Sequence, residues 1–484
     1  MIGLKLIERG IGVVSTLILA RLLMPGDFGL IAMAMAVIAF VEVAGQFGFD
    51  LALIRLRDVG RAHYDSAWTL QVGYGFVAGA AIALLAWPTA AYFGEPRVAP
   101  VMWVLAAVAV IQGFENIGTV DFRKEFKYEK DFQFLLAKKL VSFVVTLALA
   151  LTFRSYWALV AGMATSRVAG VVLSFFMHPY RPRFDTSQVR SLMGFSTWVL
   201  VLRLVDYLKN RGPDFLIGRH FGAGALGEFR VGLEIATLPT SELLFPLMRA
   251  VFPGYAAVAQ DRQRLAQTFL AVQGTIVTLT LPAGIAIVLL ADPIVYLLLG
   301  PRWAGAIPLV QVLGIFGALT VFQLTNVSIF HVLGVPQQAA WLKVAETLLT
   351  LSTIFVIVWK GLGLTWIPWA MVVVQLLMVP VGMHLIARLL NIGFAQRLRV
   401  TWRPLLTATV MGATIWLALQ WLPGTGNTWR AGLQLALIVP VAGLVLLLGT
   451  WALWRAAGYP EGPEQQLVSL VRARLRKGPD RSVK

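Results

Sequence analysis

The sequence predicts an all-α integral membrane protein with about fourteen transmembrane helices. Hydrophobic residues make up 58% of the 484 positions and charged residues only 13%, about half the charged share of soluble proteins. Apolar runs of about 20 residues recur along the chain, and each is long enough to cross a hydrocarbon core about 30 Å thick. The runs are continuous rather than alternating, so we expect helices and not a barrel.

Short links that often contain glycine or proline separate the expected helices, as in Met24-Pro25-Gly26 and Gly300-Pro301-Arg302. The first apolar run begins almost at Met1 and lacks a small-residue cleavage site, so we expect a retained helix rather than a signal peptide. The predicted helices cover residues 3–23, 29–51, 66–92, 99–119, 132–153, 156–177, 193–221, 227–257, 265–291, 305–333, 339–359, 365–390, 404–422 and 431–454.

The order of these helices suggests four parts of the chain. Residues 1–185 are expected to form an N-terminal six-helix lobe and residues 186–392 a second one. Residues 393–454 add a further transmembrane helix pair, and residues 455–484 form a basic cytoplasmic tail. Within the first lobe, the mixed-charge segment 121–131 is compatible with an amphipathic helix at the membrane surface or with a solvated loop.

The net charge of +17 is distributed unevenly among the links. One alternate set of links is rich in basic residues, and it contains Arg55, Arg57, Arg61, Arg123, Lys124, Lys127, Lys130, Arg181, Arg183, Arg190, Arg262, Arg264, Arg397, Arg399 and Arg403. The positive-inside rule therefore places both termini in the cytoplasm, in a bacterial inner membrane. No basic module stands apart from the apolar runs, so we do not expect a nucleic-acid partner. The chain has no cysteine, which excludes disulfides and thiolate chemistry.

An internal repeat appears when the chain is shifted by 198 residues. Two of the matches are charge types inside apolar helices, where charges are rare, so we infer a duplication that yields two pseudo-symmetric lobes. The matched positions are Arg21 with Arg219, Gly26 with Gly224, Gly29 with Gly227, Lys5 with Arg203, and Glu8 with Asp206. The same shift predicts a first helix about one and a half turns shorter than its counterpart, through an upstream start codon or a genuine truncation.

Charges inside the membrane are the candidate functional residues, because each costs about 2.5–3.5 kcal/mol at the bilayer centre unless it is paired or hydrated. They concentrate on the first, second, seventh and eighth helices. The cations expected to bind substrate in a central cavity are Lys5, Arg9, Arg203 and Arg230. The acids expected to hold them, or to take part in ion coupling, are Glu8, Glu42, Asp206, Asp214 and Glu234.

These charges are expected either to line a cavity or to neutralise one another locally. Arg230 with Glu234, and Lys343 with Glu346, have the spacing of local pairs that only neutralise one another. Further membrane charges are Glu115 and Arg167. The dipeptide Gly212-Pro213 is expected to break or kink the seventh helix near its polar face.

Signatures of catalysis are missing from the sequence. The histidines are isolated, with no metal-ligand spacing, and no Walker loop occurs. We therefore expect no catalytic residue, no metal, no cofactor and no enzymatic activity.

Three motifs resemble a known family. Residues 21–30, RLLMPGDFGL, look like the "ARLLxPxDFG" link after the first helix of the polysaccharide transport family of oligosaccharide flippases. Residues 121–127, DFRKEFK, resemble the loop before its fifth helix, and residues 156–162, YWALVAG, resemble the opening of its sixth. The resemblance covers roughly residues 1–185 and departs from the family's glycine-rich turn at Arg154-Ser155.

This resemblance implies the fold of the multidrug/oligosaccharidyl-lipid/polysaccharide exporter superfamily, working by alternating access. It also implies a cargo, a polyprenyl-diphosphate-linked oligosaccharide carried across the inner membrane for capsule, exopolysaccharide or O-antigen assembly. The implied partners are that lipid-linked oligosaccharide, membrane lipids, and the polysaccharide polymerase and export machinery.

Three other functions were weighed against this one. A lipid II flippase is a close alternative. A multidrug/cation antiporter would require an anionic cavity, which the predicted cations disfavour. A membrane-embedded glycan polymerase or ligase would require a large periplasmic loop, and every predicted periplasmic loop is short.

Overall fold

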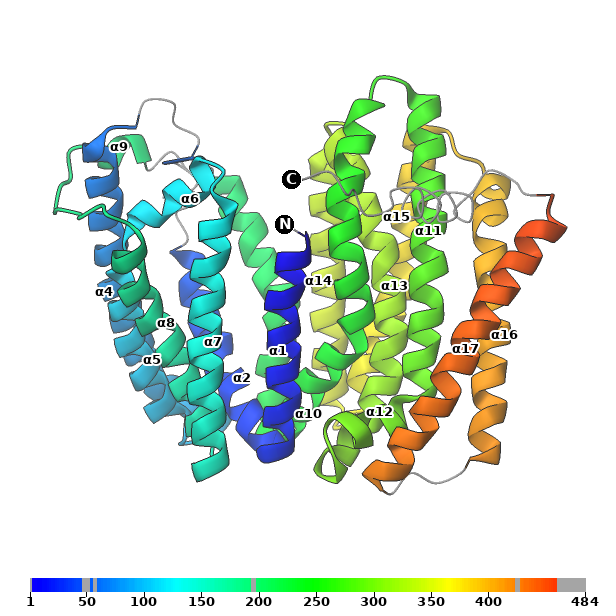
Figure 1. Cartoon of the computed structure of the whole chain (residues 1–484), viewed down its shortest axis with the longest axis horizontal. Helices are drawn as coiled ribbons and strands as arrows, with labels where there is room; N and C mark the ends of the chain where they lie inside the picture. The colour runs from blue at the N-terminus through cyan, green and yellow to red at the C-terminus, as the bar shows by residue number, and fades with distance from the viewer. Residues whose placement is uncertain (1, 46–52, 55–58, 193–196, 423–426, 459–484) are drawn as a thin grey trace, which may run out of the picture. The chain divides into compact units, whose positions relative to one another are not determined.

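The computed structural model of the chain is a bundle of helices (Figure 1). It describes residues 2–45, 53–54, 59–192, 197–422 and 427–458, and within these ranges there is no strand. The helices fall into two compact units. The first unit comprises residues 1–230 with 354–364, and the second comprises residues 231–353 with 365–484. The lobe boundaries predicted from the sequence remain predictions.

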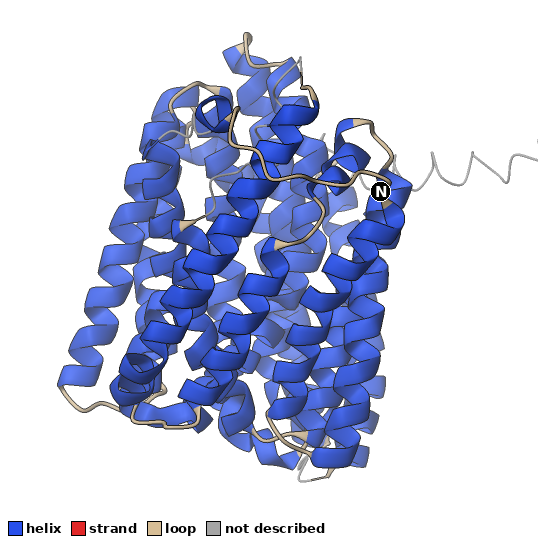
Figure 2. Cartoon of the chain, turned by 90° about the vertical axis from the view of Figure 1, so that its left-hand side faces the viewer, coloured by secondary structure: helices blue, strands red, loops and turns tan. Residues whose placement is uncertain are grey.

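The first unit is built from long helices that run alongside one another (Figure 2). Proline in the first turn starts α2, and left-handed Gly94 ends α4, as glycine commonly does. Arg154, also left-handed, ends α7. Its elements are α1 (Ile2–Leu22), α2 (Pro25–Ala44), α4 (Arg61–Phe93), α5 (Val98–Gly113), η1 (Ile117–Val120), α6 (Asp121–Lys124), α7 (Tyr128–Phe153), α8 (Trp157–Met177), α9 (Val189–Leu192) and the first part of α10 (Thr197–Ala257).

The second unit has its apolar core between α10, α11, α13 and α15, around Tyr255, Phe269 and Phe330. A further cluster, which includes Met411 and Ile438, packs α16 and α17 against α11. The remaining elements of the unit are α11 (Arg262–Leu289), α12 (Ala291–Leu298), η2 (Pro301–Ala306), α13 (Ile307–Val332), α14 (Pro336–Trp359), α15 (Trp366–Leu390), α16 (Phe394–Trp421) and α17 (Thr428–Ala456).

Ten helices of the described chain are long and apolar enough to cross a membrane. An eleventh candidate is α5 joined to η1 and α6, a pair bent by 75°. The chain is therefore a multi-pass membrane protein, whereas the total of about fourteen spans stays a prediction. In α1 the apolar stretch is the shorter segment Gly10–Leu22, and α10 is not among the ten.

Three details differ from the sequence-based expectations. The helix expected at 99–119 ends at Gly113, where the chain bends. Segment 121–131 is neither a single amphipathic helix nor a simple loop, because α6 buries Phe122 while Phe126 is exposed in a left-handed conformation. The backbone is helical at Gly212-Pro213, where a break or kink was expected, and the non-helical residue of α10 is Gly222 (φ 81°), in the predicted link between helices 193–221 and 227–257.

The non-helical conformation at Gly222, and not at Gly212-Pro213, has a physical reason. A φ of 81° is open to glycine and rarely to other residues, so Gly222 is where the chain turns most easily. A proline inside a membrane helix is tolerated when neighbouring groups bind the freed backbone. Pro213 has no amide hydrogen to donate to the carbonyl of Lys209, and the next carbonyl, of Asn210, accepts a hydrogen bond from Arg230 Nη2 at 2.6 Å.

Candidate functional site

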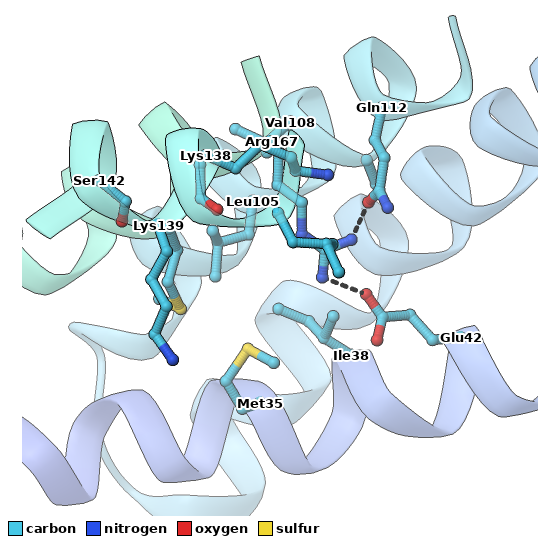
Figure 3. Close-up of a pocket in the computed structure, with 14 residues that line it drawn as sticks. Met35, Ile38, Glu42, Leu105, Val108, Gln112, Lys138, Lys139, Ser142 and Arg167 are labelled. Atoms are coloured by element: carbon cyan, nitrogen blue, oxygen red, sulfur yellow. Dashed lines mark hydrogen bonds and ion pairs between the residues drawn. The ribbon is translucent and has the colours of Figure 1, made fainter. Parts of the chain in front are cut away.

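A cavity of about 400 Å³ lies inside the first unit, between α2, α5, α7 and α8 (Figure 3). Its walls mix apolar side chains with seven polar or charged ones. The polar and charged lining residues are Glu42, Gln112, Lys138, Lys139, Ser142, Ser166 and Arg167. A cavity with this lining inside an apolar helix bundle is the strongest candidate for a functional site.

Helical periodicity brings these residues to the cavity wall. On α7 the lining residues are Leu135, Lys138, Lys139 and Ser142, which have the i, i+3, i+4 and i+7 spacing of one helix face. The lining residues on the other three helices follow the same spacing. Each helix therefore presents one face to the cavity, and that face contains both apolar and polar residues.

Arg167 on α8 is the centre of the polar contacts in the cavity. Its Nη2 donates to Glu42 Oε1 on α2 at 3.0 Å, and its Nη1 donates to Gln112 Oε1 on α5 (Figure 3). The side chains of Arg167 and Glu42 are each 34% exposed. The guanidinium thus ties three helices together while remaining accessible.

Lys138 forms an ion pair with a residue that does not line the cavity. Its Nζ lies 3.4 Å from Glu115 Oε2, beside Gly170, where a methyl group would lie only 2.7 Å from Nζ. Glu115 follows the end of α5 at the 75° bend. Gln71 Nε2 donates to the carbonyl oxygens of Gly113 and Glu115 at 3.1 and 2.8 Å, which binds backbone groups released by the bend.

Lys139 extends from the next position of α7 toward the side of α2 that carries Met35 (Figure 3). Its Nζ would lie 3.0 Å from a methyl group on Gly12 of α1. Three cations and one carboxylate therefore line the cavity. Glu42 and Glu115 pair with Arg167 and Lys138, so the lining cations exceed these two carboxylates by one. In a low-dielectric bundle, positive charge on a cavity wall attracts anions.

Among the residues predicted from the sequence, the structure places Glu42 in this cavity. It also brings Asp214 and Arg230 together elsewhere in the first unit. Arg230 Nε donates to Asp214 Oδ1 at 2.5 Å, Arg230 Nη2 makes a second contact, and Arg211 Nη1 lies 3.5 Å away. Asp214 is fully buried. The pair joins the two parts of α10 on either side of Gly222.

The other predicted site residues are not tested by these contacts. The side chains of Lys5, Glu8 and Arg9 lie outside the described part of α1. Arg203 and Asp206 are half-buried on α10. Glu234 is exposed and belongs to the second unit. Their roles in binding cargo or coupling ions stay predictions, as does that of Arg230.

Sequence reasoning left six of the seven polar or charged cavity residues out of the candidate site, namely Gln112, Lys138, Lys139, Ser142, Ser166 and Arg167. Arg167 was noticed as a membrane charge but had no partner at helical spacing. A usable signal was present in α7, because two lysines near the middle of an apolar helix are costly in lipid.

A charged, accessible cavity inside a bundle of apolar helices marks a multi-pass membrane protein with a polar site at membrane depth. The chain belongs to the family described as "Polysaccharide biosynthesis protein", whose model matches residues 18–308. The resemblance found in the sequence motifs is thereby confirmed.

Curated relatives agree with this family. The chain is 24% identical over 318 residues to the lipopolysaccharide biosynthesis protein WzxC of Escherichia coli, covering 64% of each chain. It is 24% identical over 308 residues to the succinoglycan biosynthesis transport protein ExoT of Rhizobium meliloti, covering 63% of this chain and 62% of ExoT. The chain thus matches less than two thirds of the length of these two relatives. The teichuronic acid biosynthesis protein TuaB of Bacillus subtilis is 22% identical over 388 residues, covering 77% of this chain and 78% of TuaB.

Solved structures establish the fold. The lipid II flippase MurJ in an inward closed conformation superposes with a TM-score of 0.74 at 11% identity, covering 94% of this chain and 98% of MurJ. An inward-facing multidrug resistance transporter of the MATE family, in the MOP superfamily, gives 0.61 at 16% identity, covering 81% and 94%. At such low identities the likeness concerns the fold alone.

Proposed function

We propose that this protein translocates a polyprenyl-diphosphate-linked oligosaccharide across the bacterial inner membrane by alternating access, for capsule, exopolysaccharide or O-antigen assembly. The observation that carries the proposal is the cavity of the first unit, with Lys138, Lys139 and Arg167 on its walls. Membership of the polysaccharide biosynthesis family supports the glycan as cargo.

The chemistry of the cavity suits such a cargo. A diphosphate offers several anionic oxygens, and each charge-assisted hydrogen bond to a cation contributes about 1.5–3 kcal/mol. Serine hydroxyls and the Gln112 amide in the same lining are partners for sugar hydroxyls. The polyprenyl chain is as apolar as the membrane interior and needs no polar site.

The cavity disfavours the multidrug/cation antiporter that shares the fold. A binding site for cationic drugs needs a surplus of carboxylates, whereas Glu42 is the one acidic residue among the described lining residues of this cavity. A cationic drug there would meet the positive charges of Lys138, Lys139 and Arg167, which Glu42 and Glu115 offset only in part.

Translocation is testable with purified protein in proteoliposomes. The substrate is a polyprenyl-diphosphate-linked oligosaccharide with a fluorescent sugar, and a membrane-impermeant quencher reports which leaflet holds it. We expect protein-dependent movement of the label, which Arg167→Ala slows at least 10-fold through loss of charge-assisted contacts. Lipid II serves as a competitor, and its preferential transport would favour the lipid II alternative. Correctly inserted protein that moves no diphosphate-linked glycan would refute the proposal.

A further inference from the structure

We propose that Glu42 is an internal substitute for the anionic group of the cargo. In the empty cavity its carboxylate binds Arg167, and an incoming oxyanion displaces it. This inference rests on the proposed function, because it requires an anionic cargo group in this cavity. The oxyanion is a phosphate of the lipid carrier or a carboxylate of a sugar, which share the same chemistry toward a guanidinium.

The accessibility of the pair separates it from a purely structural ion pair. Both side chains of the Arg167–Glu42 pair are 34% exposed, and both line the cavity. In the same unit, Asp214 of the Asp214–Arg230 pair has a side chain with 0% exposure and lines no part of this cavity. A sealed pair cannot exchange partners without opening the fold, whereas a partly exposed pair can.

The empty cavity needs such a counter-charge. An arginine facing a cavity within the membrane is costly unless an anion lies next to it, so Glu42 stabilises Arg167 when cargo is absent. An oxyanion of the cargo neutralises the same guanidinium, so Arg167 keeps a counter-charge throughout the exchange, while the displaced carboxylate of Glu42, 34% exposed, faces the cavity.

Gln112 gives the exchange a fixed geometry. Its amide oxygen accepts a hydrogen bond from Arg167 Nη1, while Glu42 occupies Nη2. A neutral amide competes only weakly with an anion for the guanidinium. Gln112 therefore keeps the guanidinium pointing into the cavity when the carboxylate of Glu42 leaves. Lys139 lines the same cavity from α7.

Competition makes a prediction of definite sign. Glu42→Gln keeps the size of the side chain and an acceptor oxygen for Arg167, but removes the competing charge. We expect it to bind an oxyanion roughly 5- to 10-fold more tightly than the unmodified protein. If Glu42 only positioned Arg167, the same change would weaken binding or leave it unaltered.

Isothermal titration calorimetry on full-length protein in phosphatidylcholine nanodiscs tests this, with inorganic pyrophosphate and glucuronate titrated separately. The stronger of the two ligands identifies the cargo group. Arg167→Ala should weaken binding at least 10-fold, and adding Glu42→Gln to it should give no gain, because the competitor has lost its target. The matched control is Glu95→Gln, which breaks the 2.8 Å Glu95–Arg97 pair in the link between α4 and α5. It should leave binding unchanged.

Gln112→Glu provides an independent variant with the opposite sign. It places a second carboxylate on Arg167 and should weaken oxyanion binding about 5-fold. Unchanged or weaker binding by a folded Glu42→Gln variant, with Arg167→Ala still harmful, would overturn the exchange and leave the proposed function standing. Binding that is insensitive to Arg167→Ala would remove the anion site itself, and with it the support for the proposed function.

Discussion

Gly29 and Gly227 contact each other through their backbones in a reciprocal arrangement. A methyl group on Gly29 would lie 1.7 Å from the carbonyl oxygen of Ala223, and one on Gly227 would lie 1.9 Å from the carbonyl oxygen of Pro25. Both Gly29 and Gly227, and Pro25 and Ala223, are 198 positions apart. The contact therefore maps onto itself under the shift found in the sequence, as expected at a pseudo-twofold axis, and it supports the predicted duplication.

This contact leaves no room for a side chain. We expect Gly29→Ala to destabilise the protein by about 1–3 kcal/mol, because two backbone segments must separate. Thermal unfolding of purified protein checks this, with Gly26→Ala as control, since a methyl group at Gly26 meets nothing within 4 Å. Equal melting temperatures for the two variants would show that the close approach does not persist in the membrane protein.

The buried Asp214–Arg230 pair should matter more for stability than any exposed pair. Asp214→Ala leaves a guanidinium without its carboxylate and is expected to cost about 3–5 kcal/mol. Arg230→Lys should retain only part of the stability of the unmodified protein, because lysine cannot make the bidentate contact with the Asp214 carboxylate. Arg97→Ala in the exposed Glu95–Arg97 pair is the control, with an expected change below about 1 kcal/mol. A tolerated Asp214→Ala would argue against a structural role.

His178, at the end of α8, should make stability depend on pH. Burial lowers the pKa of His178 below its ordinary value of 6.5, although Asp121 Oδ2 lies 3.4 Å from Nε2 and opposes the shift. Its Nδ1 accepts a hydrogen bond from the Tyr180 amide at 3.2 Å, which protonation would abolish.

Because the folded pKa is the lower one, the unfolded state binds the proton first, and stability falls as pH drops through 6.5. We expect the melting temperature to fall more between pH 7.5 and 5.5 in the unmodified protein than in His178→Gln. The exposed His384→Gln is the control. The same pH dependence in all three proteins would exclude His178 as the cause.

Topology can be read from two exposed link residues on either side of the predicted membrane. The side chains of Lys127 and Arg97 are 54% and 52% exposed. Single cysteines at these two positions should therefore differ in labelling because of the membrane side on which they lie, not because of burial. An impermeant maleimide added to intact spheroplasts should label position 97 and spare position 127. The reverse pattern would invert the predicted orientation.

The predicted cargo role of Arg203 remains open to a charge-reversal test. Arg203→Asp combined with Asp206→Arg preserves the local charge balance on α10. We expect normal membrane insertion but low polymer export, measured as surface polysaccharide, because the cation no longer lies where the cargo needs it. Restored export in the double variant would assign the pair a purely structural role.

Much of the architecture followed from local patterns. Continuous apolar runs of about 20 residues predict helices, because only helices and closed barrels satisfy their backbone in lipid and a barrel needs alternating residues. The long observed helices overlap these runs. The turn at Gly222 lies in the predicted link between helices 193–221 and 227–257, whereas the backbone at Gly212-Pro213 is helical. Gly212-Pro213 has the stronger local signal for a break, but tertiary hydrogen bonds in a membrane protein can support a proline within a helix.

The candidate site depended on information that a linear pattern lacks. Spacing suggested that Arg230 pairs with Glu234 one turn away, whereas the structure pairs it with Asp214 across the turn in α10. Likewise Arg167 has no partner at i+3 or i+4, and its contacts come from α2 and α5.

The sequence by itself determined the membrane class, the helix-forming segments and the family, because these depend on composition, period and motif along one chain. The repeat stays a prediction. Only the tertiary structure decided that Glu42, Lys138, Lys139 and Arg167 share a cavity. Helical periodicity states which residues share a face of one helix. Which faces meet depends on how the helices rotate and pack, and that is set by contacts between segments far apart in the sequence.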